Sequence, residues 1–130
     1  MATQLDDTLA ATSLTGVERR VLERLVAHLR HELGEDLRAV WLYGSRARGE
    51  TPHPESDVDL MVIADGGERR YGFRAHELAY AAATAEGASP AWYSVHLHDP
   101  DWLRGRREIE SFFIREVDRD KVVLQGSGLE

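Results

Sequence analysis

The sequence predicts an α/β (α+β) fold, a small mixed β-sheet covered by helices, in a single domain. Two observations lead to this prediction. Segments whose apolar residues recur at helical spacing alternate along the chain with short apolar strands. The chain also has 130 residues, enough for one modest hydrophobic core but too few for a second domain.

The first half of the chain predicts one long helix and two buried strands. The helix is expected over residues 17–33, because Thr15 and Glu18 fit a capping box at its start. Continuous apolar runs predict strands over residues 38–43 and 57–63. Between them, Ser45 is expected to cap a short helix that Gly49 ends, and Asp65-Gly66-Gly67 should turn the chain out of the second strand.

The second half predicts two more helices and two more strands. The helices are expected over residues 73–85 and 108–116, with one further helical turn after Asp99-Pro100, and the strands over residues 92–98 and 121–124. The side chains expected to face inward from the last helix are Ile109, Phe112, Phe113 and Val117. We expect a flexible N-terminus over residues 1–14, a domain over residues 15–125 and a flexible tail over residues 126–130.

Two carboxylates at the start of the second strand are the strongest chemical signal. Asp57 and Asp59 are two residues apart, so both should project from the same face of the strand. Adjacent like charges are costly unless a cation lies between them, and hard divalent ions such as Mg2+ prefer such oxygen ligands. The Gly44-Ser45 turn offers N–H groups and a hydroxyl that suit phosphate. The alternative is a solvated strand start beside an ordinary strand-to-helix turn.

Together these residues resemble the signature of the DNA polymerase β-like nucleotidyltransferase superfamily, and most of all its minimal, stand-alone members. The family pattern is Gly-Ser, a loop of about ten residues, and then Asp-x-Asp on the next strand. Here Gly44-Ser45 is followed by a loop one residue longer than usual, and then by Asp57-Val-Asp59. The resemblance is densest over residues 40–64.

The resemblance implies a role for each residue of the motif. Asp57 and Asp59 would be catalytic and would bind Mg2+, while the nucleoside triphosphate would be held by the residues of the turn. Those nucleotide-binding candidates are Gly44, Ser45, Arg46 and Arg48. For the two arginines, the alternative is an ordinary surface position.

The third carboxylate of the family is not found where it is expected. It normally stands on a neighbouring strand, here residues 92–98, whose polar face offers Ser94 and His96 and no carboxylate. Asp99 and Asp101 lie beyond the end of that strand. Ser94 and His96 therefore mark a vacant third-carboxylate position, with His96 either a proton acceptor or a half-exposed bystander.

Composition narrows the function classes. The formal charge of −7 argues against bulk nucleic-acid binding, and the absence of cysteine excludes disulfides and thiolate metal sites. No apolar run is long enough to span a bilayer, so we expect no membrane association and a cytoplasmic protein. The remaining histidines, without the spacing of metal ligands, are His28, His31, His53 and His76.

Two classes of function follow from the resemblance. The first is a nucleotidyltransferase that transfers a nucleoside monophosphate from a Mg2+-bound triphosphate to a hydroxyl, on a partner protein or elsewhere. The second is an antitoxin-like module, weakly active or inactive, that covers a small helical ribonuclease of the HEPN class; the acidic charge suits a basic partner. Aminoglycoside nucleotidylation is a weaker third reading, because those enzymes carry an additional domain. A homodimer is left open.

Overall fold

A four-stranded mixed sheet forms the centre of the part of the chain that the computed structural model describes, residues 8–51 and 57–130. Its strands lie in the order β3-β2-β1-β4. Their bounds are β1 Leu37–Tyr43, β2 Val58–Ala64, β3 Tyr93–His98 and β4 Val122–Gly126. β1 pairs antiparallel with β2 and β4, whereas β2 and β3 are parallel. The predicted mixed sheet covered by helices is confirmed.

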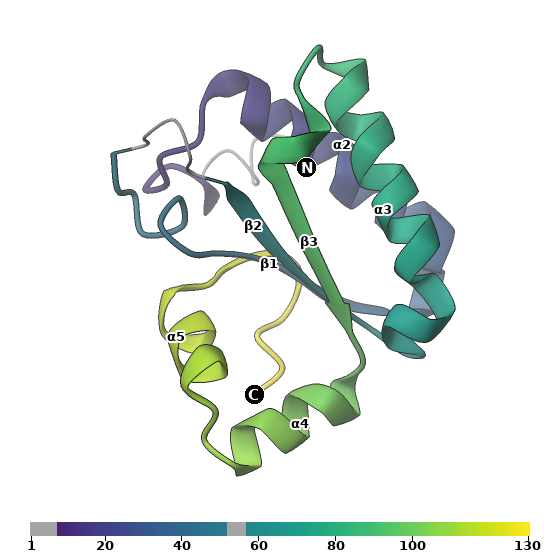
Figure 1. Cartoon of the computed structure of the whole chain (residues 1–130), viewed down its shortest axis with the longest axis vertical. Coiled ribbons are helices and arrows are strands. Elements are labelled where there is room, and N and C mark those ends of the chain that lie inside the picture. The colour runs from purple at the N-terminus through teal and green to yellow at the C-terminus, as the bar shows by residue number, and fades with distance from the viewer. Residues whose placement is uncertain (1–7, 52–56) are drawn as a thin grey trace.

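Helices cover both faces of this sheet (Figure 1). One face packs against α2 (Gly16–Leu33) and α3 (Gly67–Ala85). The other face packs against α4 (Pro100–Glu108), α5 (Phe112–Asp120) and the C-terminal segment. The strand alternation decides which side chains meet which layer. The second face carries Ala39, Trp41, Tyr43, Met61 and Ile63 from the two central strands.

The N-terminus of α2 forms the predicted capping box. The Thr15 hydroxyl accepts a hydrogen bond from the Glu18 backbone N–H at 3.2 Å, and the Glu18 carboxylate accepts one from the Thr15 N–H at 2.8 Å. The helix ends as expected at Gly34, whose φ is +55°. The sequence therefore locates both ends of α2 to within one residue.

α3 begins earlier than predicted, at Gly67 instead of residue 73. Its first turns are polar, so the apolar pattern alone placed the start too late. Gly67 and Gly72 are buried there, and a Cβ on Gly67 would lie 2.9 Å from the Asp99 backbone nitrogen. Small residues thus bring the start of α3 close to the end of β3.

The C-terminal helices correct the sequence prediction most strongly. Instead of a helix over residues 108–116, α4 begins at Pro100 with Asp99 as its N-cap, and α5 follows a break in which Glu110 has φ +52°. The buried residues of α5 are Ile114 and Val117. Val117 is inward as predicted, whereas the other three expected inward residues, Ile109, Phe112 and Phe113, are exposed.

The segments that we expected to be flexible at the two ends belong, where described, to the packed fold. Leu9 and Leu14 are buried in the core cluster of α2 and α3, whereas residues 1–7 lie outside the described part. At the other end, the Trp41 indole donates to the Ser127 carbonyl oxygen at 2.8 Å, and Leu129 packs on the second face of the sheet. Among the described residues, no helix has the length and apolarity needed to cross a membrane.

Candidate active site at the β1–β2 edge

The two carboxylates of the Asp-x-Asp motif lie close together at the start of β2. This is the end of the sheet where β1 finishes and β2 begins, and we call it the β1–β2 edge. Asp57 directly precedes the strand, and Asp59 is its second residue, paired with Tyr43 of β1. Both are half-buried. Burial, and then the neighbouring charge of Asp57, raise the pKa of Asp59 above its ordinary value, while His96 acts in the opposite direction. The fold therefore holds a carboxylate where its charge is disfavoured without a cation.

The Gly44 turn lies directly against the Asp59 carboxylate. Gly44 has φ +81°, and a Cβ at this position would lie 2.6 Å from Asp59 Oδ2. The following residues form overlapping hydrogen-bonded turns, with the N–H groups of Ala47 and Arg48 donating to the Gly44 carbonyl oxygen at 3.1 and 3.2 Å. The short helix expected after Ser45 is thus replaced by a compact turn, which ends near Gly49 as predicted.

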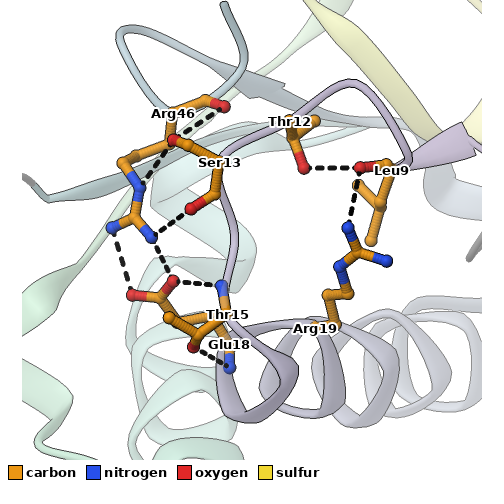
Figure 2. A network of polar contacts seen from close by, with 7 residues as sticks. All are labelled: Leu9, Thr12, Ser13, Thr15, Glu18, Arg19 and Arg46. Carbon is orange, nitrogen blue, oxygen red and sulfur yellow. Dashed lines mark hydrogen bonds and ion pairs between the residues drawn. The ribbon is translucent and has the colours of Figure 1, made fainter. Parts of the chain in front are cut away.

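Arg46 points away from solvent into a polar network with the N-terminal segment and α2. Its side chain is only 3% exposed. The guanidinium donates to the Ser13 carbonyl oxygen at 2.9 Å and to the Ser13 hydroxyl at 3.1 Å, and it pairs through two nitrogens with the Glu18 carboxylate (Figure 2). Glu18 therefore has two roles, since it caps α2 and also anchors the Gly44 turn through Arg46. These contacts of Arg46 are all structural, and its contact with a nucleotide stays a prediction.

Arg48 lies on the outer side of the same turn and is partly exposed. Its Nε donates to Glu50 at 2.6 Å, and its Nη1 donates to Asp120, the last residue of α5, at 3.1 Å. These carboxylates raise its pKa above the ordinary value. Arg48 is therefore the more exposed arginine of the turn, and its pair with the exposed Glu50 is one that a phosphate group can replace at little cost.

Ser94 and His96 lie on the same face of the sheet as Asp59. In the parallel pairing of β2 with β3, Asp59 is aligned with Ser94 and Met61 with His96. The Ser94 hydroxyl and His96 Nε2 are 3.3 Å apart. Ser94, beside Asp59, is thus the closer strand neighbour of the carboxylates, while Asp99 caps α4 through a 2.7 Å hydrogen bond from the Trp102 N–H.

Two aromatic side chains complete the surroundings of the motif, and neither was among the candidate residues. Tyr43 is buried between rings on either side, with centroids 6.3 Å from His96 and 5.7 Å from Phe113. Burial, followed by the charge of Asp59, raises the pKa of Tyr43, so its phenol stays neutral. The period-two pattern of β1 could have located Tyr43, since it places that ring on the Asp59 face. Phe113 was assigned to the wrong side of its helix.

The donor set at this edge fits a hard divalent cation that keeps several of its own waters. Among the described residues, no group of three or more histidine and carboxylate side chains is arranged to hold a metal. Nevertheless, one or two carboxylates are the usual protein ligands in Mg2+ sites that substrate phosphates complete. Here the ionised form of Asp59 is disfavoured by burial and by the charge of Asp57. A Cβ on Gly44 would collide with Asp59 Oδ2, so the glycine lets this carboxylate lie directly against the turn.

Comparison with known proteins agrees with the geometry. The model of the family described as "Polymerase beta, Nucleotidyltransferase" matches residues 23–87, half of the chain, and this range includes the Gly44 turn and both carboxylates. No curated protein matches the chain significantly.

Two solved structures share the fold at low sequence identity. One, a toxin–antitoxin with AMP-PNP, is 24% identical, with a TM-score of 0.52 over 81% of this chain and 73% of that one. The other, a mutant of the toxin–antitoxin MntA-HpeT, is 20% identical, with a TM-score of 0.50 over 78% of this chain and 71% of that one. With the family match, the sheet order and the placement of the motif, these findings show that the chain belongs to the polymerase β-type nucleotidyltransferase family.

Proposed function

We propose that the chain binds a nucleoside triphosphate with Mg2+ at the β1–β2 edge and transfers its nucleoside monophosphate to a hydroxyl group. In this reaction the acceptor oxygen forms a bond to the α-phosphorus, the α–β anhydride bond breaks and pyrophosphate leaves. The hydroxyl proton passes to solvent or to the pyrophosphate. The observation that carries the proposal is the contact between the Gly44 turn and the Asp59 carboxylate, which puts a phosphate-type turn beside a cation-type carboxylate pair.

Each residue of the site has a distinct role in this proposal. Asp57 and Asp59 would hold Mg2+, which supplies positive charge against the triphosphate oxygens. Ser45 and the N–H groups of the turn would bind phosphate, and Arg48 would leave Glu50 and Asp120 to offset the charge of the leaving pyrophosphate. Arg46 would support the same turn from beneath through Ser13 and Glu18, and a direct nucleotide contact would require it to leave them.

Calorimetric titration with a non-hydrolysable ATP analogue tests the proposal. We expect binding with Mg2+, loss of binding with a chelator, and a loss of more than about 100-fold in an Asp57→Asn, Asp59→Asn variant, since even indirect disturbance of metal ligands costs up to about that factor. An Asp101→Asn, Glu108→Gln variant is the control, because it removes the same charge from exposed positions of α4. Equal affinity in all three proteins would remove the carboxylate pair from the site.

A second candidate function is an antitoxin-like module that covers a basic ribonuclease partner without turning over. The Ser94 and His96 positions favour it, since β3 presents no carboxylate beside Asp59. The two solved relatives are toxin–antitoxin proteins, and the net charge of −7 suits a basic partner. Transfer of label from α-labelled ATP to a partner distinguishes the two functions. If the module is inactive only for want of the third carboxylate, Ser94→Asp should restore transfer.

A further inference from the structure

Phe113 is an exposed aromatic ring that the fold holds beside the carboxylate site. It lies at the N-terminal end of α5, and 41% of its surface is accessible to solvent. Its ring meets Tyr43 edge to face, at 85° and 5.7 Å between centroids. Tyr43 directly precedes Gly44 and is the strand partner of Asp59. The exposed ring therefore contacts the residue that directly precedes the phosphate-type turn.

The two exposed rings beside Tyr43 have different surroundings. His96 lies on the carboxylate side, where it interacts electrostatically with Asp59 and is hydrogen-bonded to Ser94. Phe113 lies on the α5 side and offers a purely apolar ring. A flat ligand group that covered this ring would bury apolar surface, which favours binding. Charged groups of a ligand would thus gather near His96, and an uncharged, flat group would fit near Phe113.

We propose that Phe113 is the stacking surface for the nucleobase of the triphosphate, a specificity-determining subsite that rests on the function proposed above. A nucleoside triphosphate has the matching layout, with charged phosphates at one end and a flat base at the other, separated by a ribose. Tyr43 fixes the orientation of the Phe113 ring through the edge-to-face contact. Stacking on a single ring tolerates every base, and larger purine rings gain more from it than pyrimidines.

The inference is tested by comparing a ligand that has a base with one that lacks it. Calorimetry is performed on the full chain with Mg2+, using a non-hydrolysable ATP analogue and inorganic tripolyphosphate. We expect Phe113→Ala to weaken the nucleotide by about 10-fold, within the range measured for base–aromatic stacking, and to leave tripolyphosphate unchanged. Phe113→Trp should retain the affinity of the parent, and a CTP analogue should bind the parent more weakly than the ATP analogue does.

Phe112→Ala is the matched control. Phe112 is the adjacent residue of α5 and is 75% exposed, so its removal takes away a similar ring without touching the site. Thermal unfolding of each variant verifies the fold. Equal nucleotide affinity in Phe113→Ala and Phe112→Ala, with tripolyphosphate still bound, would overturn the base subsite alone. A parent that binds neither ligand would overturn the proposed function together with the subsite that depends on it.

Discussion

At the scale of single residues, Asp59 is a proposed metal ligand whose ionised form is disfavoured by the fold. The carboxylate is half-buried, and Gly44, which lacks a Cβ, leaves room for its Oδ2. Burial and the charge of Asp57 raise the Asp59 pKa. Because the folded-state pKa lies above the unfolded one, Asp59 favours folding below the unfolded pKa, and this contribution is lost as the pH rises through the folded pKa. The ionised site is thus a local weakness of the fold until a cation binds.

An Asp59→Asn variant should therefore unfold at a higher temperature than the parent at neutral pH without divalent ions. The asparagine has nearly the same volume and carries no charge to desolvate. The gain should shrink as the pH is lowered toward the ordinary carboxyl pKa of 3.8, where the parent Asp59 is itself protonated. Scanning calorimetry from neutral to acidic pH measures this difference. A stabilisation that persists unchanged in acid would show that the charge of Asp59 is not its cause.

Arg46 shows how a residue of the motif also serves stability. Its guanidinium is buried against the half-buried Glu18 carboxylate, and removal of one partner from a buried ion pair costs about 3–5 kcal/mol. Arg46→Ala should lower the free energy of unfolding by that amount in urea titrations. Arg48→Ala, in the same turn but with a guanidinium that is itself exposed, should cost less than about 1 kcal/mol. Similar losses in both variants would contradict the structural role of Arg46.

At the scale of elements, α5 links the site to the rest of the molecule. Its first turn places Phe113 beside Tyr43, and its last residue, Asp120, pairs with Arg48 of the Gly44 turn. Between them, Ile114 and Val117 anchor the helix to the sheet, one turn apart and nearly without exposure. The helix therefore lies along the site with its apolar stripe toward the sheet, while its first two aromatic residues, Phe112 and Phe113, stay exposed to solvent.

Alanine substitutions along α5 test this orientation. Ile114 is 1% exposed, and Ile114→Ala should lower the free energy of unfolding by about 2–5 kcal/mol. Phe112→Ala should change it by no more than about 0.5 kcal/mol, as for other exposed positions. Urea titration of both variants gives the comparison. The reverse order would restore the orientation predicted from sequence, with the phenylalanines inward.

The helices α2 and α5 show which parts of the fold the sequence could predict and which it could not. In α2, a local capping box and a helical apolar stripe act together, so Thr15, Glu18 and Gly34 defined the helix. In α5, four large apolar residues compete for one short stripe, and the choice between Phe113 and Ile114 depends on the distant sheet surface. The partners of the buried Arg46 could not be predicted either, because Ser13 and Glu18 are far from it in sequence.

At the scale of the whole molecule, the parallel neighbours β2 and β3 gather the site from separate parts of the chain. The β1–β2 edge supplies the Gly44 turn and both carboxylates, β3 supplies Ser94 and His96, and α5 covers the same face of the sheet (Figure 1). A cavity of about 1140 Å³ lies elsewhere, between α4 and the C-terminal segment. Arg38, Arg104 and Leu103 are among its lining residues. The position of the bound metal therefore distinguishes a site at the Gly44 turn from one in this cavity.

The most direct measurement locates the divalent ion in the presence of nucleotide. Mn2+ is added in substoichiometric amounts to isotope-labelled protein with a non-hydrolysable ATP analogue, and paramagnetic broadening of backbone amide signals is followed by NMR. The account predicts selective broadening at Gly44, Ser45 and Asp59, which excess Mg2+ reverses. Broadening centred on Arg38 and Leu103 beside the large cavity, or no selective broadening at all, would contradict a metal–nucleotide site at the β1–β2 edge.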